Sequence, residues 1–341
     1  MMKIYDSARK FLALLDGACR NVYTTETLST GYKTLCFQVP CLPEYLNLIQ
    51  EENYVGTEDY NYVIKEILLE GNDFLTVYAN ADVEDLDGTV FNIFDCFEKS
   101  VEQSYLYCLT PVNNWSLQYE SKNQSLFTLQ TAQVSSLEMI REIAKLNEQE
   151  LWFDTKRRVV IVYDKMGIVG STYYSNELRL KQLRKQSATY DYATVLIPIG
   201  KDGLRISSVN NGKDYLENFT YSDKYIQKFW VNEDYTVPEL LMGAGQDYLD
   251  SIAMPRASYK LDLAELGDTI GLGDTIMIVD AIKRVKQEQR AVKIVRYPYE
   301  PERSSVELSN LQVDFARTFI EDQKVLQKEI AYLKKVIQNM K

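Results

Sequence analysis

Short runs in which apolar and polar residues alternate fill the first 80 residues, and this period of two predicts strands. Lys3–Tyr5 is a short opening strand. Two hairpins follow, each joined by a turn of Ser, Thr, Gly, Asn or Asp: Arg20–Leu28 with Tyr32–Val39, and Asp59–Leu69 with Phe74–Asn80. Strands at this spacing predict a small β barrel or sandwich.

The period changes to a helical one near residue 97. Apolar residues that recur every three or four positions predict a first helix, from Phe97 through Cys108 and ending before Pro111. Ser135-Ser-Leu-Glu138 is a capping box that predicts the start of a second helix. Glu150–Asp154 and Arg158–Tyr163 then predict a hairpin, so this segment is a compact α/β insertion.

The second half returns to strands after one more helix. Pro238 is predicted to start a helix over Leu240–Met254, which Pro255 ends. The turn Gly271-Leu-Gly-Asp274 leads into one of four further strands. These strands are Tyr259–Leu263, Thr275–Asp280, Arg290–Arg296 and Ser304–Leu308. They predict a second β unit, of the size of a small barrel.

The last thirty residues carry apolar positions at alternating spacings of three and four. Such a seam, over more than three heptads, predicts a coiled coil, and a single amphipathic helix packed on its own domain is the alternative. The pattern does not settle how many helices associate. The seam residues are Ala316, Phe319, Gln323, Leu326, Ile330, Leu333, Ile337 and Met340.

The predicted fold class is therefore α+β, mainly β, with two β units of small-barrel size, an α/β insertion, a helical segment and a C-terminal helix. The predicted segments are a first β unit (1–96), the insertion (97–165), a connector with β-hairpins (166–222), an aromatic and helical segment (223–256), a second β unit (257–311) and the coiled-coil helix (312–341).

Composition removes several classes of function. The 341 residues include no histidine, so serine–histidine triads, cysteine–histidine dyads and histidine-bearing zinc sites are excluded. The net charge of −11, with basic residues interspersed, argues against binding of nucleic acid. The five cysteines form no C-x-x-C pair and predict buried free thiols in a reducing cytoplasm. No run of the sequence is long enough to span a bilayer, and no cofactor is predicted.

Three acidic or aromatic clusters are candidate sites. Asp82–Gly88 resembles a calcium loop but lacks ligands at the required positions, so an acidic surface turn is predicted and no metal site. Glu148, Glu150 and Asp154 could serve as the carboxylate pair of a peptidoglycan hydrolase. Tyrosines that crowd the central region suit a protein interface or a carbohydrate-binding antireceptor. These tyrosines are Tyr190, Tyr192, Tyr215, Tyr221, Tyr225 and Tyr235.

Tyr190–Asn218 is the most distinctive stretch of the chain. Its β-branched run and its two glycine turns predict strand, turn, strand, turn, strand. Gly200-Lys-Asp-Gly203 and Gly212-Lys-Asp214 are not phosphate loops, because no upstream glycine lies at Walker spacing and neither lysine precedes Ser or Thr.

This stretch resembles the segment shared by prophage endopeptidase-tail or tail-associated lysin proteins of phages with low-GC Gram-positive hosts. The first turn matches at Pro198, Gly200, Lys201, Asp202, Gly203 and Leu204, and the second at Val209, Asn210, Gly212, Lys213, Asp214 and Tyr215. Asn211 stands where the family often has glycine. Further similarity lies in Ser136–Leu146 with Glu150–Asp154, and in Leu272-Gly-Asp274 with Ile276–Asp280.

The resemblance implies a baseplate-hub-like fold, in which the two β units (1–96 and 257–311) are β-barrel-like tube domains, and a structural role at the tail tip. Three copies would form a ring beneath the tail tube, with the distal tail protein and the tape-measure protein as partners. Tail-fibre or receptor-binding components are possible further partners, and DNA would pass only as cargo. The expected location is the virion, after synthesis in the bacterial cytoplasm. Because the sequence stops at Lys341 within the heptads, we expect any C-terminal lysin module to be missing or very short, and no catalytic residue is carried over.

Overall fold

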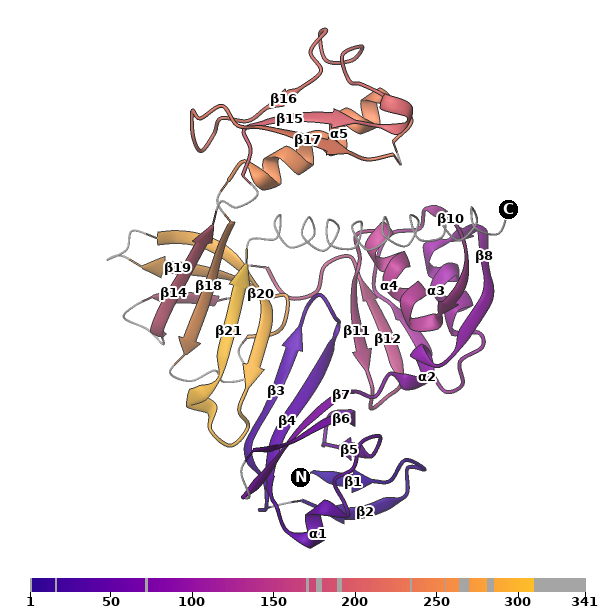
Figure 1. Cartoon of the computed structure of the whole chain (residues 1–341), viewed down its shortest axis with the longest axis vertical. Coiled ribbons are helices and arrows are strands. Elements are labelled where there is room, and N and C mark those ends of the chain that lie inside the picture. Colours follow the sequence, from indigo (N-terminus) through magenta and orange to yellow (C-terminus); the bar gives the residue numbers. More distant parts are fainter. Residues whose placement is uncertain are drawn as a thin grey trace. The chain divides into compact units, whose positions relative to one another are not determined.

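The computed structural model describes residues 2–15, 17–70, 73–169, 172–175, 180–188, 192–233, 235–254, 256–263, 270–280 and 285–309 (Figure 1). The chain divides into two compact units. Unit 1 comprises residues 1–182 and 261–307, and unit 2 comprises residues 183–260 and 308–341. The boundary between the units lies within three strands, β14 (Leu180–Ala188), β18 (Arg256–Leu263) and β21 (Ser305–Ser309).

The first part of unit 1 is a meander of antiparallel strands. Its elements are β1 (Lys3–Tyr5), β2 (Phe11–Leu14), β3 (Arg20–Thr27), β4 (Tyr32–Pro40), α1 (Pro43–Leu46), β5 (Tyr54–Gly56), β6 (Asn61–Glu70), β7 (Phe74–Ala81) and α2 (Glu84–Asp87). Both predicted hairpins are confirmed, because β3 pairs with β4 and β6 pairs with β7. Strand β2 was not predicted, because its apolar run is short.

The middle part of unit 1 is the α/β segment. It consists of β8 (Val90–Ser100), α3 (Val101–Leu109), β9 (Ser116–Tyr119), β10 (Leu126–Ser135), α4 (Ser136–Leu146), β11 (Glu150–Asp154) and β12 (Val159–Tyr163). The long strands β8 and β10 pair with each other, and β12 lies between β11 and β9. The predicted β11–β12 hairpin is confirmed.

The predicted capping box starts α4. The Ser135 hydroxyl accepts a hydrogen bond from the Glu138 amide, and the Glu138 carboxylate accepts one from the Ser135 amide. Helix α3 has a second capping box, formed by Ser100 and Gln103. This cap fixes the helix start at Val101, so the prediction that Phe97 belongs to the helix is wrong: Phe97 lies in β8, where it is exposed.

The last strands of unit 1 join the first ones in one sheet. They are β13 (Thr172–Ser175), β19 (Thr275–Asp280), β20 (Val285–Arg296) and β21 (Ser305–Ser309), with a 3-10 turn at Pro301–Arg303. Strand β20 pairs with β19 along its first half and with β3 along its second half. The order in the sheet is β14-β18-β21-β20-β3-β4-β7-β6-β5-β1-β2.

A mainly β fold is therefore confirmed. Among the described strands, no pairing closes this order into a barrel. One hydrophobic core extends from Met2 to Val162, so the first strands and the α/β segment share their buried side chains. The five cysteines are free, and Cys36, Cys96 and Cys108 are buried. In the described residues no helix is long and apolar enough to cross a membrane.

Unit 2 has a small sheet with one long helix. Its elements are β15 (Val195–Ile199), a 3-10 turn at Lys201–Gly203, β16 (Leu216–Glu217), β17 (Gln227–Val231) and α5 (Pro238–Ile252). Strand β15 is central, antiparallel to β16 and parallel to β17. The predicted helix after Pro238 is confirmed.

The prediction of a strand between the two glycine turns is wrong. Residues 204–215 form turns instead, and β15 pairs directly with β16. The predicted positive φ at the two glycine turns is confirmed, because Gly203 and Gly212 have φ of +79° and +80°. Asn210 explains the difference, since its side chain binds the carbonyl oxygen of Tyr215 at 2.8 Å and stabilises a local turn in place of a ladder.

Candidate functional site

Strand β11 contacts the turn between β3 and β4 through its backbone. The Phe153 amide donates to the Gly31 carbonyl oxygen at 2.7 Å, and the Tyr60 hydroxyl donates to the Phe153 carbonyl oxygen at 2.6 Å. A Cβ atom on Gly31 would lie 2.4 Å from the carbonyl oxygen of Leu151, and its φ is +70°. Both the close approach and the left-handed backbone require glycine here. We call these contacts, with those of Thr155 and Arg290 below, the β11 junction.

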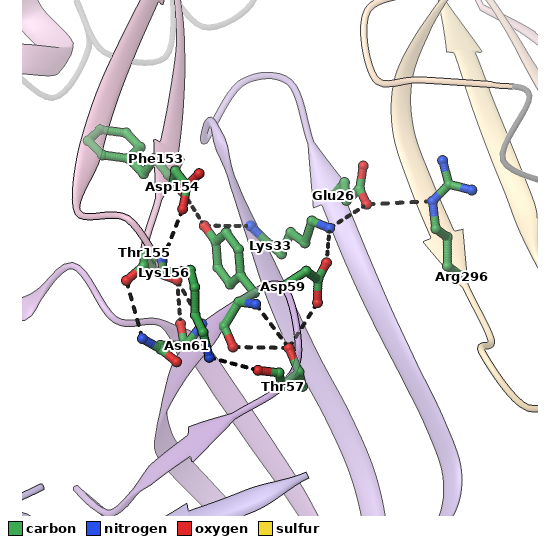
Figure 2. A network of polar contacts seen from close by, with 11 residues as sticks. Glu26, Lys33, Thr57, Asp59, Asn61, Phe153, Asp154, Thr155, Lys156 and Arg296 are labelled. Carbon is green, nitrogen blue, oxygen red and sulfur yellow. Dashed lines mark hydrogen bonds and ion pairs between the residues drawn. The ribbon is translucent and has the colours of Figure 1, made fainter. Parts of the chain in front are cut away.

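The turn after β11 is joined to the start of β6. The Thr155 hydroxyl donates to the Asn61 carbonyl oxygen at 2.9 Å and accepts from the Asn61 amide at 2.8 Å. The Asn61 side-chain amide donates to the Thr155 carbonyl oxygen, and Lys156 Nζ donates to the carbonyl oxygen of Thr57 (Figure 2). A buried threonine that satisfies both backbone groups of one residue fixes the register between two segments.

Lys33 lies between two carboxylates beside this turn. Its Nζ is 2.9 Å from Asp59 and 3.3 Å from Glu26, and Glu26 also faces Arg296 of β20 at 3.5 Å (Figure 2). Burial by itself would lower the pKa of Lys33, but the Glu26 and Asp59 carboxylates outweigh it and the pKa is raised. Burial likewise opposes the lowered pKa of Asp59, and the hydrogen bond and charge of Lys33 outweigh it. Lys33 of β4 therefore forms ion pairs with Glu26 of β3 and with Asp59, and Glu26 also contacts Arg296 of β20.

Arg290 is the most buried cation of the junction. It is 2% exposed, and both of its terminal nitrogens bind the Glu150 carboxylate, which is 5% exposed. Its Nε donates to the Gly273 carbonyl oxygen at 2.7 Å and its Nη2 to that of Met166 at 2.5 Å. A buried ion pair of this kind is compatible with folding because further hydrogen bonds satisfy the remaining donors.

Two glycines let the backbone of this region approach closely. Gly167 and Gly273 both have positive φ, and a Cβ on either would lie within 2.4 Å of backbone atoms of the other's segment. Asp274 ties the same loops together, accepting from the amides of Ile168 and Gly271, each at 2.7 Å. The predicted turn at Gly271–Asp274 is confirmed, and its side chains form part of a buried junction.

The acidic stretch near Asp82 is neutralised by cations of the chain. Asp82 is fully buried and binds Arg9 at 2.6 Å and Arg158 at 3.0 Å. Arg158 also binds Asp85, and Lys65 binds Glu84. The prediction of an acidic surface turn is wrong for Asp82, because the Arg9 and Arg158 guanidinium groups allow its burial. No group of three potential metal-binding side chains occurs in the described residues.

The structure does not bring the three candidate carboxylates together as a free pair. Glu148 is exposed in the loop after α4, Glu150 is held by Arg290, and Asp154 binds Arg157 at 2.6 Å. Of the predicted aromatic cluster, Tyr221 and Tyr225 are more than half exposed. The seam residues Ala316 to Met340 lie outside the described residues, as does Tyr190.

Sequence reasoning missed Arg290, Asn61 and Thr155. No local signal marks them, because each partner lies far away in the chain, Glu150 being 140 positions from Arg290.

The sequence model of the prophage endopeptidase tail family matches residues 171–319. The predicted resemblance to prophage tail proteins is confirmed. No curated protein matches the sequence significantly.

Several solved tail proteins have a similar fold along their whole length. A prophage tail protein from Listeria monocytogenes is similar with a TM-score of 0.63 at 14% identity, over 96% of this chain and 99% of that one. A prophage MuSo2 tail protein from Shewanella oneidensis gives 0.64 at 12%, over 90% and 97%. A tail protein from Neisseria meningitidis gives 0.63 at 8%, over 92% and 98%. At these identities the similarity establishes the fold, which is that of prophage tail proteins.

Proposed function

We propose that this chain is a structural protein of a phage tail tip, and that three copies form a ring at the distal end of the tail. The observation that carries the proposal is the agreement between the family match and a fold shared with tail proteins over at least 90% of the chain. The ring would link the tail tube to parts that recognise or penetrate the host.

The β11 junction suits such a role. It binds the first strands, the α/β segment and β20 to one another through buried ion pairs and backbone hydrogen bonds. A ring component that carries load between neighbours needs its segments held in a fixed relation. In this proposal the two β segments act as tube domains, and each ring position is completed by strands of adjoining copies.

The charge of the chain fits a conduit. A net charge of −11 disfavours binding of nucleic acid, so DNA would pass without adhering. The proposed partners are the distal tail protein above, the tape-measure protein within, and fibre or receptor-binding components below.

The proposed role is structural rather than enzymatic. Glu150 and Asp154 are each engaged by an arginine, which suits ion pairing rather than proton transfer to a substrate. A zymogram on peptidoglycan checks this: we expect no clearing by the wild-type chain. Clearing that Glu148→Gln abolishes would support the hydrolase instead, since this exposed residue can be changed without disturbing a buried pair.

Localisation in the particle tests the main proposal. Tails purified from an induced lysogen would be labelled with gold-conjugated antibody against this chain and imaged in negative stain. We expect label at the tail tip only, with an antibody to the major tube protein labelling the shaft as control. Label on heads, or tails free of this chain, contradicts the proposal.

A further inference from the structure

The small sheet of unit 2 has one covered face. Pro198 lies against Gly245 of α5, where a Cβ would be 3.3 Å from the proline ring. Trp230 stacks on Tyr248 of the same helix, with ring centroids 5.3 Å apart and planes 16° from parallel. Pro198 and Trp230 are partners in the β15–β17 register, so they and the residues two positions away along each strand face α5. The residues between them face the other way.

The other face of β15 and β17 carries no charge. We call it the open face, and its strand residues are Val195, Ile197, Ile199, Gln227, Phe229 and Val231. Phe229 is 64% exposed and Val231 50% exposed. On the adjoining β16, Glu217 is matched by Lys213 at 3.5 Å. Val195 is fully buried at one end of this face, and its exposed, uncharged part is the end that Phe229 and Val231 form. In a chain with 26% charged residues, this part has the composition of an interface core.

An aromatic loop adjoins the open face, where the Gln227 side-chain amide donates to the Tyr225 hydroxyl at 3.0 Å. Residues 218–226 connect β16 to β17, and Phe219 stacks with Tyr225 at 6.4 Å. The buried Thr194 holds both ends of this loop: its carbonyl oxygen accepts from the Asn218 amide, and its hydroxyl accepts from the Ile226 amide and donates to the Lys224 carbonyl oxygen. Large side chains on a loop fixed in this way bind a partner at low entropic cost.

The path of the chain indicates what covers this face. Strands β18 and β21 are neighbours in the sheet and run in opposite directions (Figure 1). Strand β18, through which the chain leaves unit 2, and strand β21, which precedes the heptads, therefore lie side by side in the sheet. Association through the heptads that the sequence predicts would bring copies of this chain together, and with them the exposed apolar residues of each unit 2.

We propose that the open face of unit 2 is a contact between copies of this chain, with unit 2 of a second copy as its occupant. The proposal rests on the ring assembly proposed above and names the surface that would form part of it. The core of the contact is Phe229 and Val231, flanked by Tyr225 and Phe219.

A photo-cross-linker at position 229 identifies the occupant directly. Full-length protein with p-benzoylphenylalanine in place of Phe229 would be mixed with isotope-labelled wild-type chain, irradiated, and analysed by mass spectrometry. We expect cross-links between chains that end within residues 192–254. The same residue at exposed Asp247, on the outer side of α5, is the control and should give none.

Other cross-linking results overturn the proposal. A cross-link from position 229 to residues 310–341 of the same chain would mean that the C-terminal segment covers the face. A cross-link to another tail protein in assembled particles, without one between copies, would assign the face to that partner. An absence of any cross-link would leave the face exposed and refute the contact.

A charge placed on the face gives a second test. Phe229→Asp should weaken association in sedimentation velocity by about tenfold or more, because the contact would bury an unpaired carboxylate. Leu240→Asp, at a residue that is 63% exposed on α5, is the matched control and should leave association unchanged. Association that neither variant weakens refutes this surface but leaves the ring intact, whereas a wild-type chain that never associates contradicts the ring itself.

Discussion

The β11 junction of unit 1 buries charged side chains, whereas the open face of unit 2 exposes apolar ones. In the junction, the charged groups of Arg290 and Glu150 are buried and bind each other. On the open face, Phe229 and Val231 are exposed and no residue that β15 or β17 contributes to it is charged. The first region is therefore complete in one copy, whereas the second is completed only by another surface.

This difference separates residues that hold the fold from residues available for assembly. A buried ion pair costs several kcal/mol when one partner is removed, because the remaining charge has no water to solvate it. An exposed apolar residue costs little to replace, since its neighbours lose few contacts. Five substitutions, in four experiments, test the contrast from the largest expected effect to the smallest.

Arg290→Met should lower the free energy of unfolding by about 3–5 kcal/mol, because it leaves the Glu150 carboxylate buried without a cation. Denaturant unfolding followed by fluorescence of Trp115 and Trp152 measures it. The double variant with Glu150→Met should recover part of the loss. A single variant as stable as the wild type would show that the pair is not buried in solution.

Gly31→Ala should destabilise unit 1 by about 2–3 kcal/mol, since its Cβ would lie 2.4 Å from the Leu151 carbonyl oxygen at a φ of +70°. Gly212→Ala is the control, because it has a φ of +80° but nothing within 4 Å of the added atom. Its cost should be only the left-handed strain, about 1 kcal/mol. Equal costs would mean that β11 does not contact this turn.

Trp230→Ala and Phe229→Ala compare the two faces of one strand. Trp230 packs on Tyr248, so its removal should cost about 2–3 kcal/mol of unit 2 stability. Phe229→Ala should change stability by less than about 0.5 kcal/mol in dilute protein. Urea unfolding followed by far-UV circular dichroism measures both, and a costly Phe229→Ala would mean that this face is covered within a single copy.

Asp59→Asn tests the electrostatic edge of the junction. Lys33 holds the pKa of Asp59 below 3.8, so the stabilising contribution of this carboxylate is present above that pH and is lost as the pH falls through the lowered pKa. Because Asp59 is largely exposed, the variant should lose less than about 1 kcal/mol near pH 7. The gap to the wild type should close below pH 3.8, and a gap that widened there would contradict the assignment.

The amino-acid sequence by itself determined most local elements. Alternation placed the β3–β4, β6–β7 and β11–β12 hairpins, and the capping box placed α4, because these signals depend on neighbours within a few residues. The same local signals failed at residues 204–215, where Asn210 stabilises turns instead of a strand. Motif similarity also identified the kind of protein.

Only the tertiary structure decided which of these elements meet. Arg290 and Glu150, or Asn61 and Thr155, lie far apart in the chain, and their pairing follows from the joining of β20 to β3 and the packing of the α/β segment on the first strands. The same is true of the open face, because alternation in β15 and β17 marks two faces but not which one α5 covers. Burial depends on which segments pack together in space. Packing therefore decides which charged side chains are buried and which apolar side chains stay exposed.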